Sequence, residues 1–160
     1  MIVRGEFVSG YIMELRKHVG KRPIIQSGAC VIVLDDMNRV MMLKRKDNGK
    51  WGLCGGSTEL GETVEETAIR EVKEETGLSV KDPVLFSVFS GEKMRYVYPN
   101  GDEVYNIAIT YICRGYEGEI KPDNEECTQV KFFDLNDLPG KISGLAKTVL
   151  NKLLREYPIL

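Results

Sequence analysis

Residues 55–78 place a glycine-rich turn directly before a strongly acidic segment with clear helix signals. Thr63 is a favourable N-cap, and Glu66, three residues later, completes a capping box. Gly77 is a natural stop, because a glycine readily adopts the left-handed conformation that ends many helices. These signals predict a helix over residues 64–75, and they make this segment the most constrained part of the chain.

Three glutamates crowd the end of this predicted helix. Glu71, Glu74 and Glu75 stand at i, i+3 and i+4, so their carboxylates project from about one turn to one side. Glu75 also falls on the apolar stripe of the helix, and a carboxylate directed toward a core is costly unless it is neutralised. A hard divalent cation such as Mg²⁺ or Mn²⁺ would offset both problems, since it prefers carboxylate oxygens.

The alternative is that these acids form a solvated helix face, paired locally with Arg70 and Lys73. The preceding Gly55-Gly56 pair favours the metal interpretation. Glycine lets the backbone approach a ligand closely and lets a carbonyl oxygen point at a cation. A glycine-rich turn that leads into an acidic helix brings backbone oxygen and carboxylates to one place.

The spacing across this segment resembles the Nudix box, G-x5-E-x7-R-E-U-x-E-E-x-G-U, in which U is a bulky aliphatic residue. Every fixed position is satisfied, by Gly56, Glu62, Arg70, Glu71, Val72, Glu74, Glu75, Gly77 and Leu78. So many constrained positions make a specific signal, and the flanking segments extend the resemblance over roughly residues 24–156. The resemblance implies an α/β/α sandwich and a MutT-like hydrolase that cleaves a nucleoside diphosphate linked to another moiety.

The same resemblance implies roles for individual residues. The implied ligands of Mg²⁺ or Mn²⁺ are Glu71, Glu74, Glu75 and the Gly56 carbonyl, with Glu59 or Glu62 completing or supporting the site. Arg70 resembles the family arginine that orients a box glutamate through an ion pair. Members often recruit a further acid from a later loop, where this chain offers Glu125 and Glu126. The general base is then Glu71 or one of these two loop residues.

Substrate contacts are less constrained by the sequence. Arg45 is available for phosphate, Trp51 and Tyr96 for stacking on a base, and Glu59 for a polar contact; each also suits an ordinary strand or surface position. Tyr96 stands near the position of a tyrosine typical of diadenosine-polyphosphate members, and residues 92–94 lack the proline of ADP-ribose members. A nucleoside triphosphate or dinucleoside polyphosphate is therefore favoured. The alternatives are an ADP-ribose or nucleotide-sugar pyrophosphatase and a non-catalytic nucleotide sensor.

Cys54 is a departure from the family pattern, because many members have proline before the two glycines. The change either loosens the turn and makes it oxidisable or fills a small buried apolar space. A cysteine near the box also suggests an alternative, an isoprenyl diphosphate isomerase. Enzymes of that kind share the scaffold, and their chemistry resembles a cysteine–glutamate pair that acts on a carbon atom of the substrate. Cys54 is not expected to be a nucleophile, because the only histidine, His18, is not positioned by the sequence to activate it.

Outside the box the chain alternates strand-like and turn-like segments. Strands are predicted at 24–34, 39–46, 84–89, 94–98, 103–113 and 130–133, with 39–46 as the hairpin partner of 24–34, and a last helix near 143–156. This pattern indicates an α/β (α+β) fold with a mixed β-sheet between helices. Residues 1–160 are expected to form one domain, with an N-terminal helical extension at about 7–20 that packs on its own domain or forms a dimer contact.

Composition narrows the functional class. The chain has 160 residues, 42% of them hydrophobic and 29% charged, as is ordinary for one soluble globular domain. A net charge of −2 argues against nucleic acid as a partner and favours a small nucleotide. No signal peptide, membrane span or C-x-x-C pair is recognisable, so the four cysteines are expected to be reduced thiols of a cytoplasmic protein.

Overall fold

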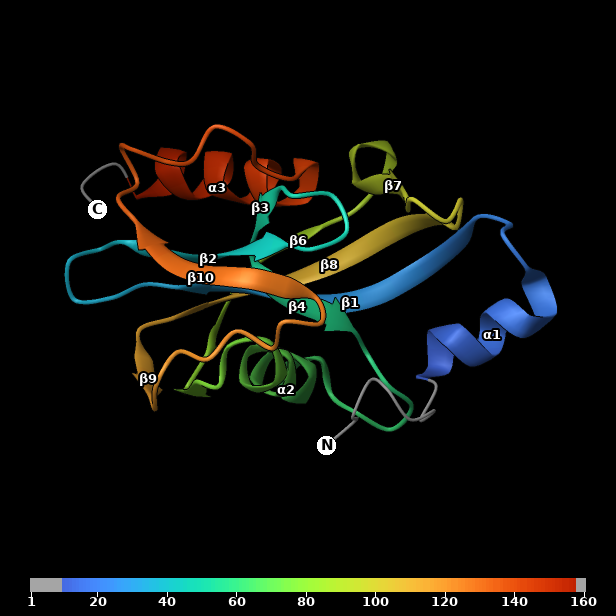
Figure 1. Cartoon of the computed structure of the whole chain (residues 1–160), viewed down its shortest axis with the longest axis horizontal. Coiled ribbons are helices and arrows are strands. Elements are labelled where there is room, and N and C mark those ends of the chain that lie inside the picture. The colour runs from blue at the N-terminus through green and yellow to red at the C-terminus, as the bar shows by residue number, and fades with distance from the viewer. Residues whose placement is uncertain (1–9, 158–160) are drawn as a thin grey trace.

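The computed structural model describes residues 10–157 and has three layers (Figure 1). Strands form the middle layer, with helix α2 (Val64–Thr76) on one side and helix α3 (Gly144–Glu156) on the other. The predicted α/β/α sandwich is therefore confirmed. Within the described residues, no helix is long and apolar enough to cross a membrane.

The larger sheet is mixed, as predicted. Its two long strands, β1 (Ile24–Val33) and β8 (Glu103–Cys113), run parallel in register from Ile24 opposite Val104 to Val33 opposite Cys113. The antiparallel neighbours are β4 (Cys54–Ser57) beside β1, and β6 (Val84–Phe89) and β7 (Arg95–Val97) beside β8. A short 3-10 turn, η1 (Glu92–Met94), precedes β7, and the Asn100-Gly101 turn joins β7 to β8.

The remaining strands form two smaller sheets. The first has the order β10 (Cys127–Phe133), β2 (Val40–Arg45) and β3 (Trp51–Gly52), and the second pairs β5 (Ser79–Lys81) with β9 (Gly115–Glu117). The predicted hairpin between residues 24–34 and 39–46 is wrong. One isolated bridge, Leu34 to Val40, is all that joins these segments, because β4 and β8 occupy both edges of β1.

Two apolar cores lie on opposite faces of β1. Val31 and Val33 belong to the cluster with Ala68 and Val72 of α2, whereas the alternate residues Ile32 and Leu34 belong to the cluster with Val149 and Leu153 of α3. This is the two-residue alternation of a strand that is covered on both faces. Cys54 is fully buried in the α2 core, so it fills apolar space as one of the two interpretations predicted.

The helix that carries the box begins and ends where the sequence predicts, within one residue. The Thr63 hydroxyl accepts from the Glu66 N–H at 3.1 Å, and the Glu66 carboxylate accepts from the Thr63 N–H at 2.8 Å. At the other end Gly77 adopts a φ of 79°. This capping fixes the rotation of α2 and therefore the direction in which each glutamate points.

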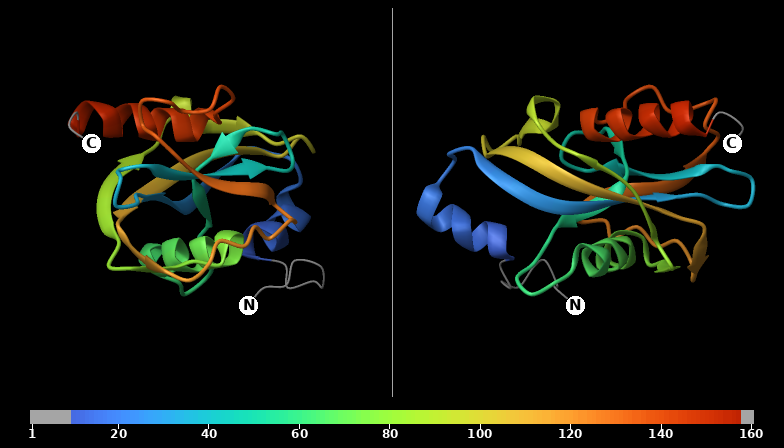
Figure 2. Two further views of the ribbon diagram at one scale, coloured as in Figure 1. Left: turned by 60° about the vertical axis from the view of Figure 1, so that its left-hand side comes forward. Right: turned by 180° about the vertical axis from the view of Figure 1, so that it is seen from behind.

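Helix α1 (Tyr11–Val19) precedes the sandwich and ends at Gly20, where φ is 62°. It accounts for the C-terminal part of the helical extension predicted at about 7–20, and residues 7–9 lie outside the described part of the chain. Figures 1 and 2 show α1 beside the ends of β1 and β8, apart from the three layers. None of its nine residues is buried, so polar anchors hold it against the domain.

Candidate metal centre and active site

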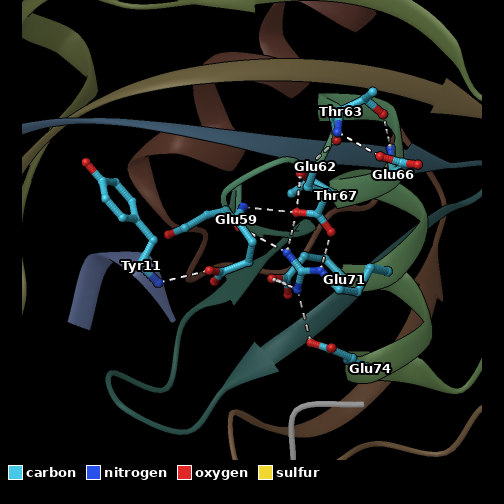
Figure 3. A network of polar contacts seen from close by, with 10 residues as sticks. Tyr11, Glu59, Glu62, Thr63, Glu66, Thr67, Glu71 and Glu74 are labelled. Atoms are coloured by element: carbon cyan, nitrogen blue, oxygen red, sulfur yellow. Dashed lines mark hydrogen bonds and ion pairs between the residues drawn. The ribbon is translucent and has the colours of Figure 1, made fainter. Parts of the chain in front are cut away.

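Arg70 organises the box through five hydrogen bonds. Its Nε and Nη2 donate to the two oxygens of Glu62 at 2.6 and 3.0 Å, and Nη2 also donates to the Ser57 carbonyl at 3.0 Å. Nη1 donates to Glu71 at 2.8 Å and to Glu74 at 3.3 Å. Figure 3 shows Glu62, Glu71 and Glu74 joined in one network, in which each carboxylate accepts from the Arg70 guanidinium. A bidentate arginine pair of this kind fixes orientation as well as charge.

Glu62 is held in its ionised form by this network. The hydrogen bonds from Arg70 lower its pKa from 4.5 to about 2, against the opposing effect of partial burial, and bonds from the Glu59 N–H and the Thr67 hydroxyl act in the same direction. Glu62 therefore supports the box by orienting Arg70. Its carboxylate lies outside the group of converging acids described below.

Replacing Glu62 by Gln is expected to reduce the loss of unfolding free energy that the protein suffers as the pH falls. A carboxylate whose pKa is lowered in the folded state adds stability above its unfolded pKa, near 4.5, and that stability is lost as the pH falls toward 2. Urea unfolding at several pH values between these limits measures the slope for the wild type and Glu62→Gln. Glu65 is exposed on helix α2, and Glu65→Gln should keep the wild-type dependence of unfolding free energy on pH. The same dependence in Glu62→Gln as in the wild type would contradict the lowered pKa of Glu62.

Three carboxylates converge beside this network. Oxygens of Glu71, Glu75 and Glu126 all lie within 4.8 Å of one another, and Glu71 and Glu75 are only 2% and 5% exposed. Glu75 also accepts a hydrogen bond from the Gly55 N–H at 3.2 Å. Arg70 offsets part of the repulsion within this group through Glu71. A divalent cation would stabilise the three neighbouring carboxylates further, and an all-oxygen donor set suits Mg²⁺ or Mn²⁺. The residues present therefore fit a hard divalent cation.

The composition of this group differs from the sequence-based set in one member. Glu74 lies one turn after Arg70 and forms an ion pair with that guanidinium at 3.3 Å, and its role as a metal ligand stays a prediction from the family resemblance. Among the described residues, the third converging carboxylate is supplied by Glu126. Of the two loop candidates, Glu126 thus reaches the cluster, while Glu125 is exposed at the rim of the same cleft.

The loop that carries Glu126 is held by one side chain that the sequence interpretation missed. Oδ1 of Asp123 accepts from the N–H groups of Glu125, Glu126 and Cys127 at 3.0, 3.0 and 3.1 Å. The Lys46 N–H donates to the Glu126 carbonyl at 2.8 Å, which ties the loop to the end of β2. An Asp that begins such a turn is a recognisable local signal, but its relation to the box depends on how β10 pairs with β2.

Gly56 is required by the close approach of Glu71. A Cβ at this position would overlap the Glu71 carboxylate, and Gly55 and Gly28 are similarly crowded by the backbones of the β1–β4 pair. The glycines therefore let the acid cluster pack directly on β4. The Gly56 carbonyl as a metal ligand remains a prediction from the family resemblance.

Replacing Gly56 by Ala is expected to displace Glu71 and weaken metal binding. Forcing a methyl group into such a contact typically costs about 1–3 kcal/mol of unfolding free energy. Calorimetric titration with Mn²⁺ and thermal unfolding measure the two effects. Gly140→Ala is the matched control, since no atom lies within 4 Å of the added Cβ there. Equal Mn²⁺ affinity in the two variants would contradict this account of Gly56.

The converging acids line a cleft of about 690 Å³, a volume in the range of small-molecule sites. Arg45 and Glu59 line it too, with Arg45 paired to Asp47 at 2.7 Å and Glu59 accepting from the Tyr11 N–H at 2.9 Å. Tyr96 lines a neighbouring cavity of about 180 Å³. Trp51 lies elsewhere: its ring packs edge-on against Phe133, with centroids 4.8 Å apart, in the α3 core.

Comparison with known proteins agrees with this geometry. The family model described as the NUDIX domain matches residues 25–153. The chain belongs to the NUDIX domain family. Over 110 residues it is 39% identical to a protein of Methanocaldococcus jannaschii named ADP-ribose pyrophosphatase, an alignment that covers 67% of this chain and 61% of that relative. It is 46% identical over 117 residues to a MutT-like protein of Streptomyces ambofaciens, covering 73% of this chain and 68% of the other.

A solved structure shares the NUDIX fold over most of its length. The MutT NUDIX hydrolase from Burkholderia pseudomallei aligns with a TM-score of 0.71 and 25% identity, covering 81% of this chain and 98% of that chain. The chain spans less than two thirds of the M. jannaschii relative, so the activity of that whole protein is not transferred by the match alone. Helix α1 lies before the matched residues 25–153.

Proposed function

We propose that this chain is a hydrolase that uses Mg²⁺ or Mn²⁺ to cleave a diphosphate linkage in a nucleoside diphosphate derivative. The observation that carries the proposal is the convergence of Glu71, Glu75 and Glu126 in one cleft, within a complete Nudix box. The family membership and the hydrolase names of the relatives point in the same direction.

The residues that line the cleft have different roles in the proposed reaction. Glu71, Glu75 and Glu126 would hold the cation, with Glu74 and the Gly56 carbonyl as the further ligands that the family resemblance implies. When bound, the cation would lower the pKa of water and neutralise phosphate oxygens. Arg70 keeps Glu71 in place, because it donates to Glu71 while its other nitrogens are fixed by Glu62 and Ser57. Glu71, Glu125 or Glu126 accepts the proton of the attacking water. Arg45 and Lys46 line the same cleft and supply positive charge for the substrate phosphates.

Two substrate classes are the leading candidates. Nucleoside triphosphates and dinucleoside polyphosphates are favoured by Tyr96 and by the absence of proline at residues 92–94. ADP-ribose is the second candidate, supported by the 39% identity to a relative named ADP-ribose pyrophosphatase. Both classes contain the diphosphate linkage that the proposed chemistry requires.

A panel of nucleoside diphosphate derivatives, incubated with Mg²⁺ and with Mn²⁺, tests the proposal. It should contain nucleoside triphosphates, diadenosine polyphosphates, ADP-ribose and nucleotide sugars, with products separated by chromatography. The expected result is metal-dependent formation of two phosphate-ended products from at least one class. No product from any compound, together with metal-dependent nucleotide binding, would contradict hydrolysis and identify a nucleotide sensor.

The isomerase alternative is disfavoured by Cys54. Its thiol is fully buried, and burial raises its pKa well above the usual value, with the charge of Glu75 acting in the same direction. A protonated, inaccessible thiol is poorly suited to chemistry on a substrate carbon. Product analysis on an isoprenyl diphosphate provides the direct check, because the isomerase forms a rearranged diphosphate and no free phosphate.

A further inference from the structure

Helix α1 forms part of the wall of the proposed active-site cleft, although it precedes the residues that the NUDIX family model matches. Ile12 and Met13 line the same cleft as the three converging carboxylates. Figures 1 and 2 show the start of α1 beside the loop that leads from β4 to α2. The cleft is therefore bounded in part by an element that precedes residues 25–153, which the family model matches.

Both ends of α1 are attached to segments that border the cleft. At the start, the Tyr11 N–H donates to Glu59 Oε2 at 2.9 Å, and Gly10 packs so closely that a Cβ there would overlap the Glu59 carboxylate. Farther along the helix, Arg16 Nη2 donates to the Glu103 carbonyl at 2.7 Å, and Arg16 Nε lies 3.8 Å from Asp102 Oδ2. The helix thus spans from the box loop to the β7–β8 hairpin.

Between these two anchors, α1 presents apolar side chains that residues 10–157 leave at least partly exposed. Met13 is 60% exposed, and no residue of α1 is buried. A thioether adapts well to flat rings and makes favourable contacts with aromatic groups. Apolar side chains that line a cleft gain stability when a ligand covers them.

The hairpin supplies groups of a different kind to the same cleft. Tyr98 offers a half-buried aromatic ring, and Asn100 and Asp102 line the cleft at the turn. The Asn100 amide donates to the Asp102 carboxylate at 3.0 Å, so these two polar groups are held in place beside the ring. An apolar wall, an aromatic ring and polar groups for hydrogen bonds are together the chemistry that recognises a heterocyclic base with its flat faces and polar edge.

We propose that α1 and the β7–β8 hairpin form the base-binding end of the cleft, with Met13 as a specificity-determining contact to the nucleobase. The ligand is a purine or pyrimidine nucleotide whose phosphates extend toward Glu71, Glu75 and Glu126. This inference rests on the proposed function for the identity of the ligand, because a nucleotide is the substrate class that the metal centre implies.

Met13→Ala tests the proposal, with Met37→Ala as the matched control. Met37 is 72% exposed in the turn between β1 and β2 and does not line the cleft, so both changes remove an exposed methionine. Steady-state kinetics on the substrate found in the panel should give a KM about tenfold higher for Met13→Ala, with kcat within about twofold of the wild type. Met37→Ala should match the wild type in both constants.

A binding measurement separates this proposal from the proposed hydrolysis. Calorimetry with adenosine, guanosine, cytidine and uridine 5′-monophosphates in Mg²⁺ should find at least one monophosphate that binds. Its affinity for the wild type and for Met37→Ala should be the same. Met13→Ala should bind it about tenfold more weakly. Equal affinity in Met13→Ala, or no binding of any monophosphate to the wild type, would overturn the proposal. The expected binding pattern without any hydrolysis in the panel would refute the hydrolase and support the role of α1.

Discussion

Replacing Glu75 by Gln is expected to lower turnover by about 100- to 1000-fold or more, while the protein stays folded. Glu75 is 5% exposed, accepts a hydrogen bond from the Gly55 N–H and lies within 4.8 Å of two other carboxylates. Glutamine has nearly the same shape and keeps an acceptor for Gly55. It removes the negative charge that draws a cation into the cluster, so metal affinity and turnover should fall together.

Three measurements make this prediction specific. Initial rates on the panel substrate give turnover, Mn²⁺ titration gives metal affinity, and circular dichroism with thermal unfolding reports the fold. Glu65→Gln removes an equal charge from the exposed face of the same helix and should keep nearly full activity. Wild-type turnover in Glu75→Gln would remove Glu75 from the metal centre.

The segment that could be predicted best from the sequence is the one governed by local interactions. The capping box and the stop at Gly77 fixed the ends of α2 to within one residue, and the helical period placed Glu75 on the buried stripe. All of these depend on residues within about one or two turns of each other. The ion pair of Glu74 with Arg70 also depends on how Glu62 positions that arginine, which the helical period alone does not encode.

The features that could not be predicted depend on contacts between distant segments. Residues 24–34 and 39–46 suggested a hairpin. Instead, β1 pairs in parallel with β8, a strand about eighty positions farther along the chain, and β2 pairs with β10 in a different sheet. The course of β3 places the Trp51 ring against Phe133, a contact between distant segments that the sequence did not predict. The position of α1 along the cleft depends likewise on Arg16 reaching Glu103, which no short-range pattern encodes.

Glu126→Gln is the second change with a large expected effect, and it separates the two loop acids. The sequence left Glu125 and Glu126 as equal candidates, whereas the fold brings only Glu126 within 4.8 Å of Glu71 and Glu75. Three bonds to Asp123 Oδ1 and the Lys46 N–H bond to the Glu126 carbonyl fix the backbone of this loop. We expect Glu126→Gln to lower turnover by about 100-fold or more, since it removes a carboxylate from the cation site.

Glu125→Gln is the matched comparison, because it makes the same chemical change one residue earlier, on an exposed side chain. Its turnover should fall by less than about tenfold, since only a charge at the rim of the cleft is lost. Mn²⁺ titration of both variants distinguishes a ligand from a remote charge: Glu126→Gln should bind the ion more weakly and Glu125→Gln almost normally. A larger loss of turnover in Glu125→Gln than in Glu126→Gln would mean that the loop rearranges when substrate binds, so that Glu125 replaces Glu126 at the metal.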